Sequence, residues 1–85
     1  MSTSDIFSDK SLLVTGGTGS FGNAMLRRFL AADIREIRIF SRDEKKQDDM
    51  RKLYASDKLK FYIGDVRDPQ SVINVMRGVD YVFQA

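Results

Sequence analysis

Short apolar runs alternate with longer amphipathic stretches along the whole chain. Four runs have the length and the β-branched or aromatic content of strands: residues 11–15, 37–40, 59–63 and 81–83. Three stretches between them carry apolar side chains at helical spacing: residues 21–32, 42–55 and 69–77. This order predicts an α/β fold in which right-handed crossovers join parallel strands. We expect the first half of a Rossmann-type doubly wound parallel sheet, with the strand order 3-2-1-4.

Local signals mark the ends of the second and third helices. Ser41 and Glu44 bound an S-R-D-E sequence that fits a capping box, in which Ser41 is the N-cap and Glu44 reaches back to it. Asp68 followed by Pro69 is typical of an N-cap and a first helical residue. Gly78 then closes the third helix.

Composition narrows the class of protein. The 85 residues form one domain at most, and a hydrophobic content of 42% is enough for a core. A net charge of +2 gives no sign of a nucleic-acid-binding surface. Without cysteine, disulfides and thiolate metal sites are impossible, and no apolar run approaches the length of a membrane span. We therefore expect a cytoplasmic protein with no metal, nucleic-acid or membrane partner.

A glycine cluster joins the first strand to the first helix. Thr15, Gly16, Gly19 and Gly22 give the pattern T-G-x-x-G-x-x-G between a strand and a helix, the context that a dinucleotide-binding turn requires. Glycine permits a positive φ, and the missing Cβ lets a pyrophosphate approach the backbone. The helix N-terminus then offers unpaired N–H groups to the phosphates. Because no Lys-Ser/Thr pair follows the glycines, a Walker-type phosphate loop is excluded.

The end of the second strand distinguishes NADP from NAD. NAD sites place Asp or Glu there, to accept a hydrogen bond from the ribose 2′-hydroxyl. Here Ser41 and Arg42 occupy that position, with Lys45 and Lys46 one turn along the helix. A hydroxyl and a guanidinium can bind the 2′-phosphate that a carboxylate would repel. We expect NADP. The nearby carboxylate of Asp43 leaves NAD as an alternative. It is also open whether Ser41 serves only as a helix cap and the basic residues only form a solvated helix face.

Asp65 and Val66 follow the third strand, where the adenine of a dinucleotide is expected. The Asp65 carboxylate can accept a hydrogen bond from the adenine amino group, and the Val66 N–H can donate one to the ring. Position alone equally allows Asp65 to be a turn residue after Gly64. Ala85 follows the fourth strand, where a small side chain lets the cofactor ribose approach.

The sequence resembles one enzyme family over residues 11–85. Three motifs carry the likeness: T-G-G-T-G-S-F-G at residues 15–22, S-R-D-E-K-K-Q at residues 41–47 and G-D-V-R-D at residues 64–68. The chain is similar to the N-terminal part of the extended short-chain dehydrogenase/reductases that modify nucleotide sugars. Among these it most resembles the UDP-N-acetylglucosamine 4,6-dehydratases of bacterial capsule, O-antigen and flagellin glycosylation. The resemblance implies NADP contacts at Thr18, Gly19, Ser20, Phe21, residues 41–46, Asp65, Val66 and Ala85.

The same resemblance implies an activity and its partners. Members of the family retain NADP, oxidise a UDP-sugar at C4, eliminate water across C5 and C6 and return the hydride to C6, and some also epimerise C5. Their Tyr-x-x-x-Lys pair lies beyond the last strand of this chain. Tyr54 and Lys58 have that spacing but precede the third strand, so we discount them.

We therefore expect residues 1–85 to be the N-terminal part of an NADP-binding domain, without catalytic or substrate-binding portions and inactive alone. The full-length enzyme is expected to be a homo-oligomer. Two alternatives stay open. One is a non-catalytic NADP-binding module, and the other is an epimerase or reductase of the same superfamily.

Overall fold

In the computed structural model, which describes residues 7–16 and 20–84, strands and helices alternate as predicted. The elements are β1 (Ser11–Thr15), α2 (Ser20–Ala31), β2 (Glu36–Ser41), α3 (Glu44–Tyr54), β3 (Leu59–Ile63), α4 (Pro69–Met76) and β4 (Tyr81–Gln84). Their boundaries lie within about two residues of the predicted ranges, which is the usual uncertainty of such ends.

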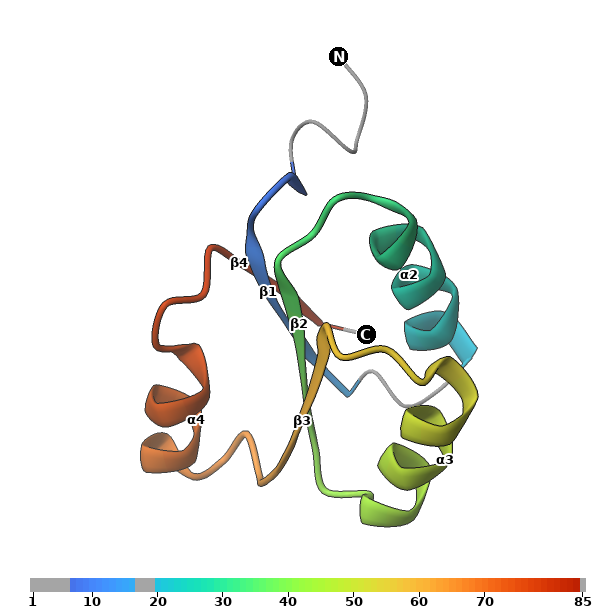
Figure 1. Cartoon of the computed structure of the whole chain (residues 1–85). Coiled ribbons are helices and arrows are strands. Elements are labelled where there is room, and N and C mark those ends of the chain that lie inside the picture. Colours follow the sequence, from blue (N-terminus) through green and yellow to red (C-terminus); the bar gives the residue numbers. More distant parts are fainter. Residues whose placement is uncertain (1–6, 17–19, 85) are drawn as a thin grey trace.

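The strands form a four-stranded parallel sheet in the order β3-β2-β1-β4, which confirms the predicted Rossmann-type topology. Val14 of β1 pairs with Ile39 of β2 on one side and with Phe83 of β4 on the other. Figure 1 shows α2 and α3 on one face of the sheet and α4 on the opposite face. This arrangement leaves the carboxyl ends of β1, β2 and β3 together at one edge, where doubly wound sheets bind ligands.

The centre of the sheet is buried on both faces. Leu12 and Val14 belong to the larger core cluster, which also contains residues of α2 and α3, whereas Leu13 packs with Phe40 and Val75 of the opposite face. The larger cluster comprises Leu12, Val14, Leu26, Phe29, Ile34, Ile37, Ile39, Met50 and Leu59. Burial on both sides explains why β1 is apolar at successive positions rather than at alternate ones.

The N-terminus of α3 differs from the prediction. Asp43, not Ser41, is the N-cap, and its carboxylate accepts a hydrogen bond from the Lys46 N–H at 3.0 Å. Ser41 is instead the last residue of β2 and pairs with Ile63 of β3. Because strand pairing continues through Ser41, the helix begins later, at Glu44, and Asp43 caps it as well as a Ser would.

The two ends of α4 follow the prediction. Asp68 is its N-cap and accepts from the Gln70 N–H, with Pro69 as the first helical residue. Beyond the other end, Gly78 has a φ of 76°, the left-handed conformation that glycine adopts without a Cβ penalty.

Arg38 of β2 ties the sheet to the C-terminal end of α4. Its Nη1 donates to the carbonyl oxygens of Val75 at 2.8 Å and of Arg77 at 2.6 Å, while Nη2 donates to the Glu36 carboxylate at 3.1 Å. Carbonyls at a helix C-terminus lack partners within the helix, and a cation there is favoured by the helix dipole. Because the Arg38 side chain is only 15% exposed, water cannot easily replace these bonds.

We expect Arg38→Met to lower the free energy of unfolding by about 2 kcal/mol, because the charged hydrogen bonds are lost from a shielded position. Urea unfolding of the purified protein measures this loss. Arg35→Met is the matched control: Arg35 is 54% exposed and pairs only across the surface with Asp9 and Asp80, so the change should cost less than about 1 kcal/mol. Equal losses for the two variants would contradict the role given to Arg38.

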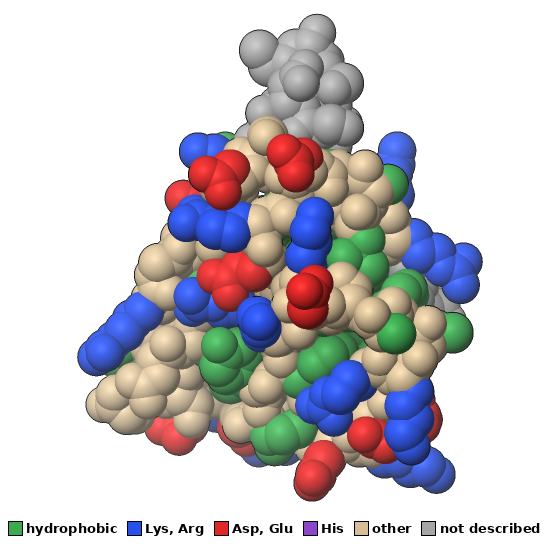
Figure 2. All heavy atoms as spheres, in the orientation of Figure 1, with side chains coloured by type: hydrophobic (Ala, Val, Ile, Leu, Met, Phe, Trp, Pro, Cys, Tyr) green, Lys and Arg blue, Asp and Glu red, His purple; other side chains and the backbone are tan. Residues whose placement is uncertain are grey.

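Charges of both signs cover the side of the molecule on which β3 lies. In Figure 2 the visible Lys and Arg side chains are interspersed with Asp and Glu rather than gathered into one basic patch. On α3, Asp48 pairs with Lys52 at 3.1 Å and with Arg51 at 3.3 Å. Each such exposed pair contributes only a few tenths of a kcal/mol. The polar face of α3 is therefore solvated, and its contribution to the fold comes from the buried residues Gln47 and Met50.

Candidate functional site

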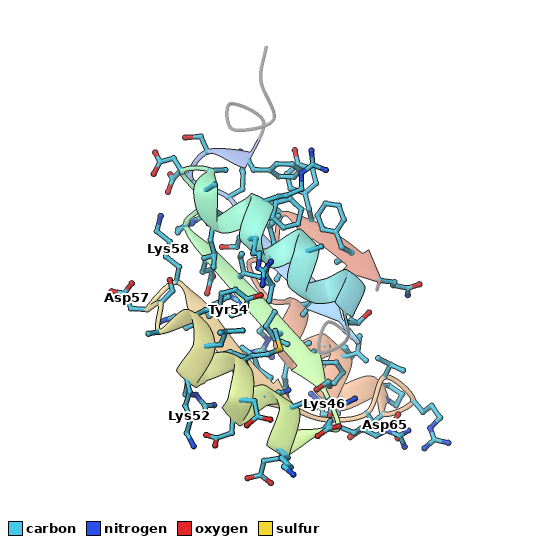
Figure 3. All side chains as sticks on the ribbon, turned by 90° about the vertical axis from the view of Figure 1, so that its right-hand side faces the viewer. Lys46, Lys52, Tyr54, Asp57, Lys58 and Asp65 are labelled. Atoms are coloured by element: carbon cyan, nitrogen blue, oxygen red, sulfur yellow. The ribbon has the colours of Figure 1, made fainter. Side chains whose placement is uncertain are left out.

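A cavity lies at the carboxyl ends of the first three strands. It has a volume of about 410 Å³ and is lined by Gly16, Phe40, Ser41, Arg42, Gly64, Asp65, Val66 and Arg67. Figure 3 shows Lys46 and Asp65 at this same end of the sheet. Five residues singled out in the sequence thus come together from the ends of three different strands: Gly16, Ser41, Arg42, Asp65 and Val66.

Gly16 begins the turn that leaves β1. Its φ is 65°, its N–H donates to the carbonyl oxygen of Phe40 at 3.1 Å, and it is exposed. The left-handed φ is the reason for glycine at this position of the predicted turn. Of the other predicted contacts near the turn, Thr18 and Gly19 lie outside the described residues, as does Ala85 at the other end of the chain.

The first turn of α2 contains three of the residues that the sequence predicts to contact the cofactor. Ser20, Phe21 and Gly22 belong to it, although their side chains lie outside the described part of the chain. This turn contains no acidic residue that would repel a phosphate. The charge of this helix start is therefore compatible with the pyrophosphate expected there.

The Ser41 hydroxyl is hydrogen-bonded to the buried side chain of Gln47. The Nε2 atom of Gln47 donates to Ser41 Oγ at 2.9 Å and to the carbonyl oxygen of Tyr62 at 2.9 Å. Gln47 is 1% exposed and reaches the ends of both β2 and β3 from α3. Its place in the site was missed in the sequence, but Gln47 shares helical spacing with the apolar residues Met50 and Tyr54, which is a detectable sign of an inward-facing position.

Asp65 is engaged by a second residue that the sequence did not single out. Both carboxylate oxygens of Asp65 accept from the Arg67 side chain, with Nη2 to Oδ2 at 2.8 Å, and Oδ1 also accepts from the Arg67 N–H at 2.9 Å. Arg42 approaches the same carboxylate, with Nη1 3.6 Å from Oδ2. The hydrogen bonds from the Arg67 side chain, more than any other contact, hold the pKa of Asp65 at about 2. Asp65 thus has the turn role that the sequence left open beside adenine binding, and its carboxylate is ionised at neutral pH.

Arg67→Gln should raise the pKa of Asp65 from about 2 toward its ordinary value of 3.8, because the guanidinium donors are removed. The carboxyl ¹³C chemical shift of Asp65, followed by NMR between pH 2 and pH 6, measures the change. Arg42→Gln is the control, since it leaves the Arg67 bonds in place and should move the pKa less. An Asp65 titration that is unchanged in Arg67→Gln would contradict the assignment.

Three other predicted residues do not line this cavity. The Asp43 carboxylate caps α3 and lies 4.0 Å from the Lys46 Nζ. Lys45 lines a different hollow, of about 580 Å³, formed on α3 and β3 with Arg51 and Phe61 among its walls. The lining of the site, as the structure has it, therefore contains Ser41 and Arg42 but no carboxylate from α3.

Tyr54 and Lys58 lie away from this cavity. Figure 3 shows Lys58 at the end of the sheet opposite to Lys46 and Asp65, where its carbonyl oxygen accepts from the N–H of Ile37 near the start of β2. Within residues 7–16 and 20–84, no group of three potential metal ligands comes together. None of the described helices is long and apolar enough to cross a membrane.

Comparison with known proteins agrees with this geometry. The model of the family described as "Polysaccharide biosynthesis protein" matches residues 12–85. A UDP-glucose 4-epimerase of Rickettsia akari is 66% identical over 84 residues, which cover 94% of this chain and 25% of the relative. The crystal structure of Pen from Bacillus thuringiensis superposes with a TM-score of 0.89 and 33% identity, covering 93% of this chain and 25% of Pen.

More distant structures share the fold alone. A short-chain dehydrogenase from Leptospira borgpetersenii with bound NAD⁺ matches 91% of this chain and 28% of its own, with a TM-score of 0.68 and 22% identity. The chain spans about a quarter of the length of the curated relatives that it matches. Because the family model covers nearly the whole sequence, the chain belongs to the polysaccharide biosynthesis protein family.

Proposed function

We propose that this chain is the NADP-binding part of an enzyme that modifies a UDP-sugar. The observation that carries the proposal is the placement of Ser41 and Arg42 in one cavity with Gly16, at the carboxyl ends of adjacent parallel strands. That is where doubly wound sheets bind dinucleotides. Membership of the polysaccharide biosynthesis family and 66% identity to a UDP-glucose 4-epimerase support a nucleotide sugar as the substrate.

The residues at the end of β2 favour NADP over NAD. A site for NAD needs a carboxylate that accepts from the ribose 2′-hydroxyl. Asp43 is the nearest candidate, but its carboxylate is used by the N-terminus of α3. Arg42 is 70% exposed beside the cavity and can pair with a phosphate, and the Ser41 hydroxyl can donate to one. The 2′-phosphate of NADP therefore fits this end of the cavity better than a bare ribose does.

The remaining walls suit the adenosine half of the cofactor. We assign the pyrophosphate to the start of α2 beside Gly16, and the adenine to the side formed by Asp65 and Val66. When bound, NADP supplies the hydride acceptor and donor that sugar oxidation and reduction need. The Asp65 carboxylate already accepts hydrogen bonds from Arg67, so an adenine amino group would compete with Arg67 for this acceptor. The Val66 N–H can instead donate directly to the adenine ring.

Two reactions are candidates for the full-length enzyme. The resemblance carried by the three sequence motifs favours 4,6-dehydration of UDP-N-acetylglucosamine, which some members of that family combine with C5 epimerisation. The name of the Rickettsia relatives favours epimerisation at C4. Incubation of the full-length protein with each UDP-sugar and NMR of the product separates them: a 4-keto-6-deoxy sugar identifies the dehydratase, and inversion at C4 without loss of water identifies the epimerase.

Self-association is part of the proposal. Tyr81 and Val82 of the edge strand β4 are 39% and 45% exposed, and an apolar strand at a sheet edge favours pairing with another chain. Sedimentation of residues 1–85 alone should therefore give a dimer or a larger species, whereas a monomer at micromolar concentration would contradict this part.

Arg42→Ala should weaken NADP binding by about 1.5–3 kcal/mol, the range for a charged hydrogen bond, and should leave NAD binding nearly unchanged. Calorimetric titration with both dinucleotides measures the two losses. Lys52→Ala is the matched control, because Lys52 pairs with Asp48 on α3, is no predicted cofactor contact, and its loss should affect neither cofactor. Equal losses of NADP and NAD affinity in Arg42→Ala would contradict a contact with the 2′-phosphate.

A further inference from the structure

We infer that Gln47 is a positioning residue for cofactor selection: its buried amide fixes the Ser41 hydroxyl as a donor toward an anion in the cavity. The inference rests on the proposed function, because the anion is the 2′-phosphate of NADP. Gln47 itself need not touch the cofactor, since it acts through the hydrogen bond to Ser41.

The orientation of the Gln47 amide is settled by its neighbours. The carbonyl oxygen of Tyr62, at 2.9 Å, can only accept a hydrogen bond, so the nitrogen of the amide must face it. The same nitrogen lies 2.9 Å from Ser41 Oγ. An amide NH₂ group donates two hydrogens and accepts none. One hydrogen therefore goes to Tyr62 and the other to Ser41 Oγ, which is closer than the Ser41 carbonyl oxygen at 3.5 Å.

The hydrogen bond from Gln47 determines whether the Ser41 hydroxyl acts as a donor or as an acceptor toward a ligand. A hydroxyl has one hydrogen to donate, and here its oxygen is already an acceptor. Its own hydrogen cannot point back at the Gln47 NH₂ group, and within the described residues no acceptor is placed to receive it. Ser41 lines the cavity, so the hydrogen is left for a group that enters there. A phosphate oxygen accepts such a bond strongly, because charge-assisted hydrogen bonds are the strong ones.

A purely structural role for Gln47 makes a different prediction. Gln47 donates a hydrogen bond to the Tyr62 carbonyl oxygen and is buried where it contacts the ends of β2 and β3. Loss of this hydrogen bond or of this packing would weaken NAD and NADP binding alike. The positioning role concerns only the cofactor that carries a 2′-phosphate. It also requires Ser41, whereas the structural role does not.

A double-mutant cycle on the full chain separates the two roles. NADP⁺ and NAD⁺ are titrated calorimetrically into the wild-type protein, Gln47→Met, Ser41→Ala and the double variant. We expect Gln47→Met to weaken NADP⁺ binding about tenfold more than NAD⁺ binding, and to cause no such extra loss of NADP⁺ affinity when Ser41 is already Ala. Equal losses for the two cofactors, the same NADP⁺ loss without the Ser41 hydroxyl, or no NADP⁺ loss would each overturn the inference.

A second measurement needs no variant and so does not depend on Gln47→Met folding. In ¹⁵N-labelled wild-type protein, the side-chain NH₂ resonances of Gln47 should shift on addition of 2′,5′-ADP but not of 5′-ADP, which lacks the 2′-phosphate. Resonances that respond equally to the two nucleotides, or to neither, would overturn the inference. A wild-type protein that prefers NADP⁺ without these effects refutes the role of Gln47 alone. A wild-type protein that binds neither dinucleotide refutes the proposed function as well.

Discussion

Ser41→Asp is expected to reverse the cofactor preference of the protein. The substitution removes a hydroxyl that donates to the 2′-phosphate and puts a carboxylate at the end of β2, where NAD sites have one. Loss of the charged hydrogen bond and repulsion between two anions together should weaken NADP binding by about 3–4 kcal/mol, a few hundredfold or more. NAD should bind more tightly, because the new carboxylate can accept from the ribose hydroxyls and is itself held by the Gln47 amide.

Ser41→Ala is the matched control for this reversal. It removes the hydroxyl without adding charge, so it should lose part of the NADP affinity and gain none for NAD. Calorimetric titration of both variants with both cofactors gives the four affinities. If Ser41→Asp keeps its preference for NADP, the 2′-phosphate does not lie at the end of β2.

Gly64→Ala is expected to have the largest effect on stability. A Cβ at Gly64 would lie 2.5 Å from Cε2 and 2.8 Å from Cζ of Phe40, a distance at which the ring must move. Phe40 is 2% exposed and packs with Leu13 and Val75, so displacement of its ring disturbs these core contacts. We expect a loss of about 3 kcal/mol in the free energy of unfolding, the upper end of the usual range for overpacked cores. Cofactor affinity should fall too, because both residues line the cavity.

A rescue experiment identifies the cause of that loss. Phe40→Leu removes the ring atoms that the new Cβ would meet, so Gly64→Ala should cost much less in the Phe40→Leu background. Gly78→Ala serves as the comparison: its φ of 76° makes the substitution strained, but the nearest atom is 3.8 Å away, and smaller neighbours should not relieve it. If Phe40→Leu fails to rescue Gly64→Ala, the cost does not come from the overlap with the ring.

The order of the elements could be predicted because each level of the sequence points to the same fold. The run Leu12–Val14 is apolar without alternation, which only a strand buried on both faces requires. Gly16 marks the end of that strand and adopts the expected positive φ. Asp68 and Pro69 mark the start of α4 unambiguously, because proline is confined to the first helical turn.

The start of α3 could not be predicted because two residues satisfy the same rule. Ser41 and Asp43 are both good N-caps, and Glu44 completes a capping box only with Ser41. Which of the two residues caps the helix depends on how far β2 pairs with β3. That pairing is a tertiary contact and cannot be predicted from the spacing of nearby residues. The correction has a functional consequence, since a Ser41 hydroxyl that caps no helix is available to a ligand.

The site was only partly visible in the sequence for a similar reason. Ser41, Arg42 and Asp65 could be singled out because they follow strands whose carboxyl ends meet at one edge. Arg67 was not, because the order of residues in the turn does not show that its side chain folds back onto Asp65. Gln47 lies in a helix of mostly charged residues, where a further polar residue is expected to be solvated rather than buried.

The most direct test of the account is to locate the bound cofactor. ¹⁵N-labelled protein titrated with NADP⁺ should show shifts concentrated at the amides of Gly16, Ser41, Gly64, Asp65 and Val66, with saturation at a concentration at least ten times lower than for NAD⁺. The other hollow, whose walls include Arg51 and Phe61, should stay unaffected. Shifts centred on Arg51 and Phe61, or equal affinity for the two dinucleotides, would contradict the account.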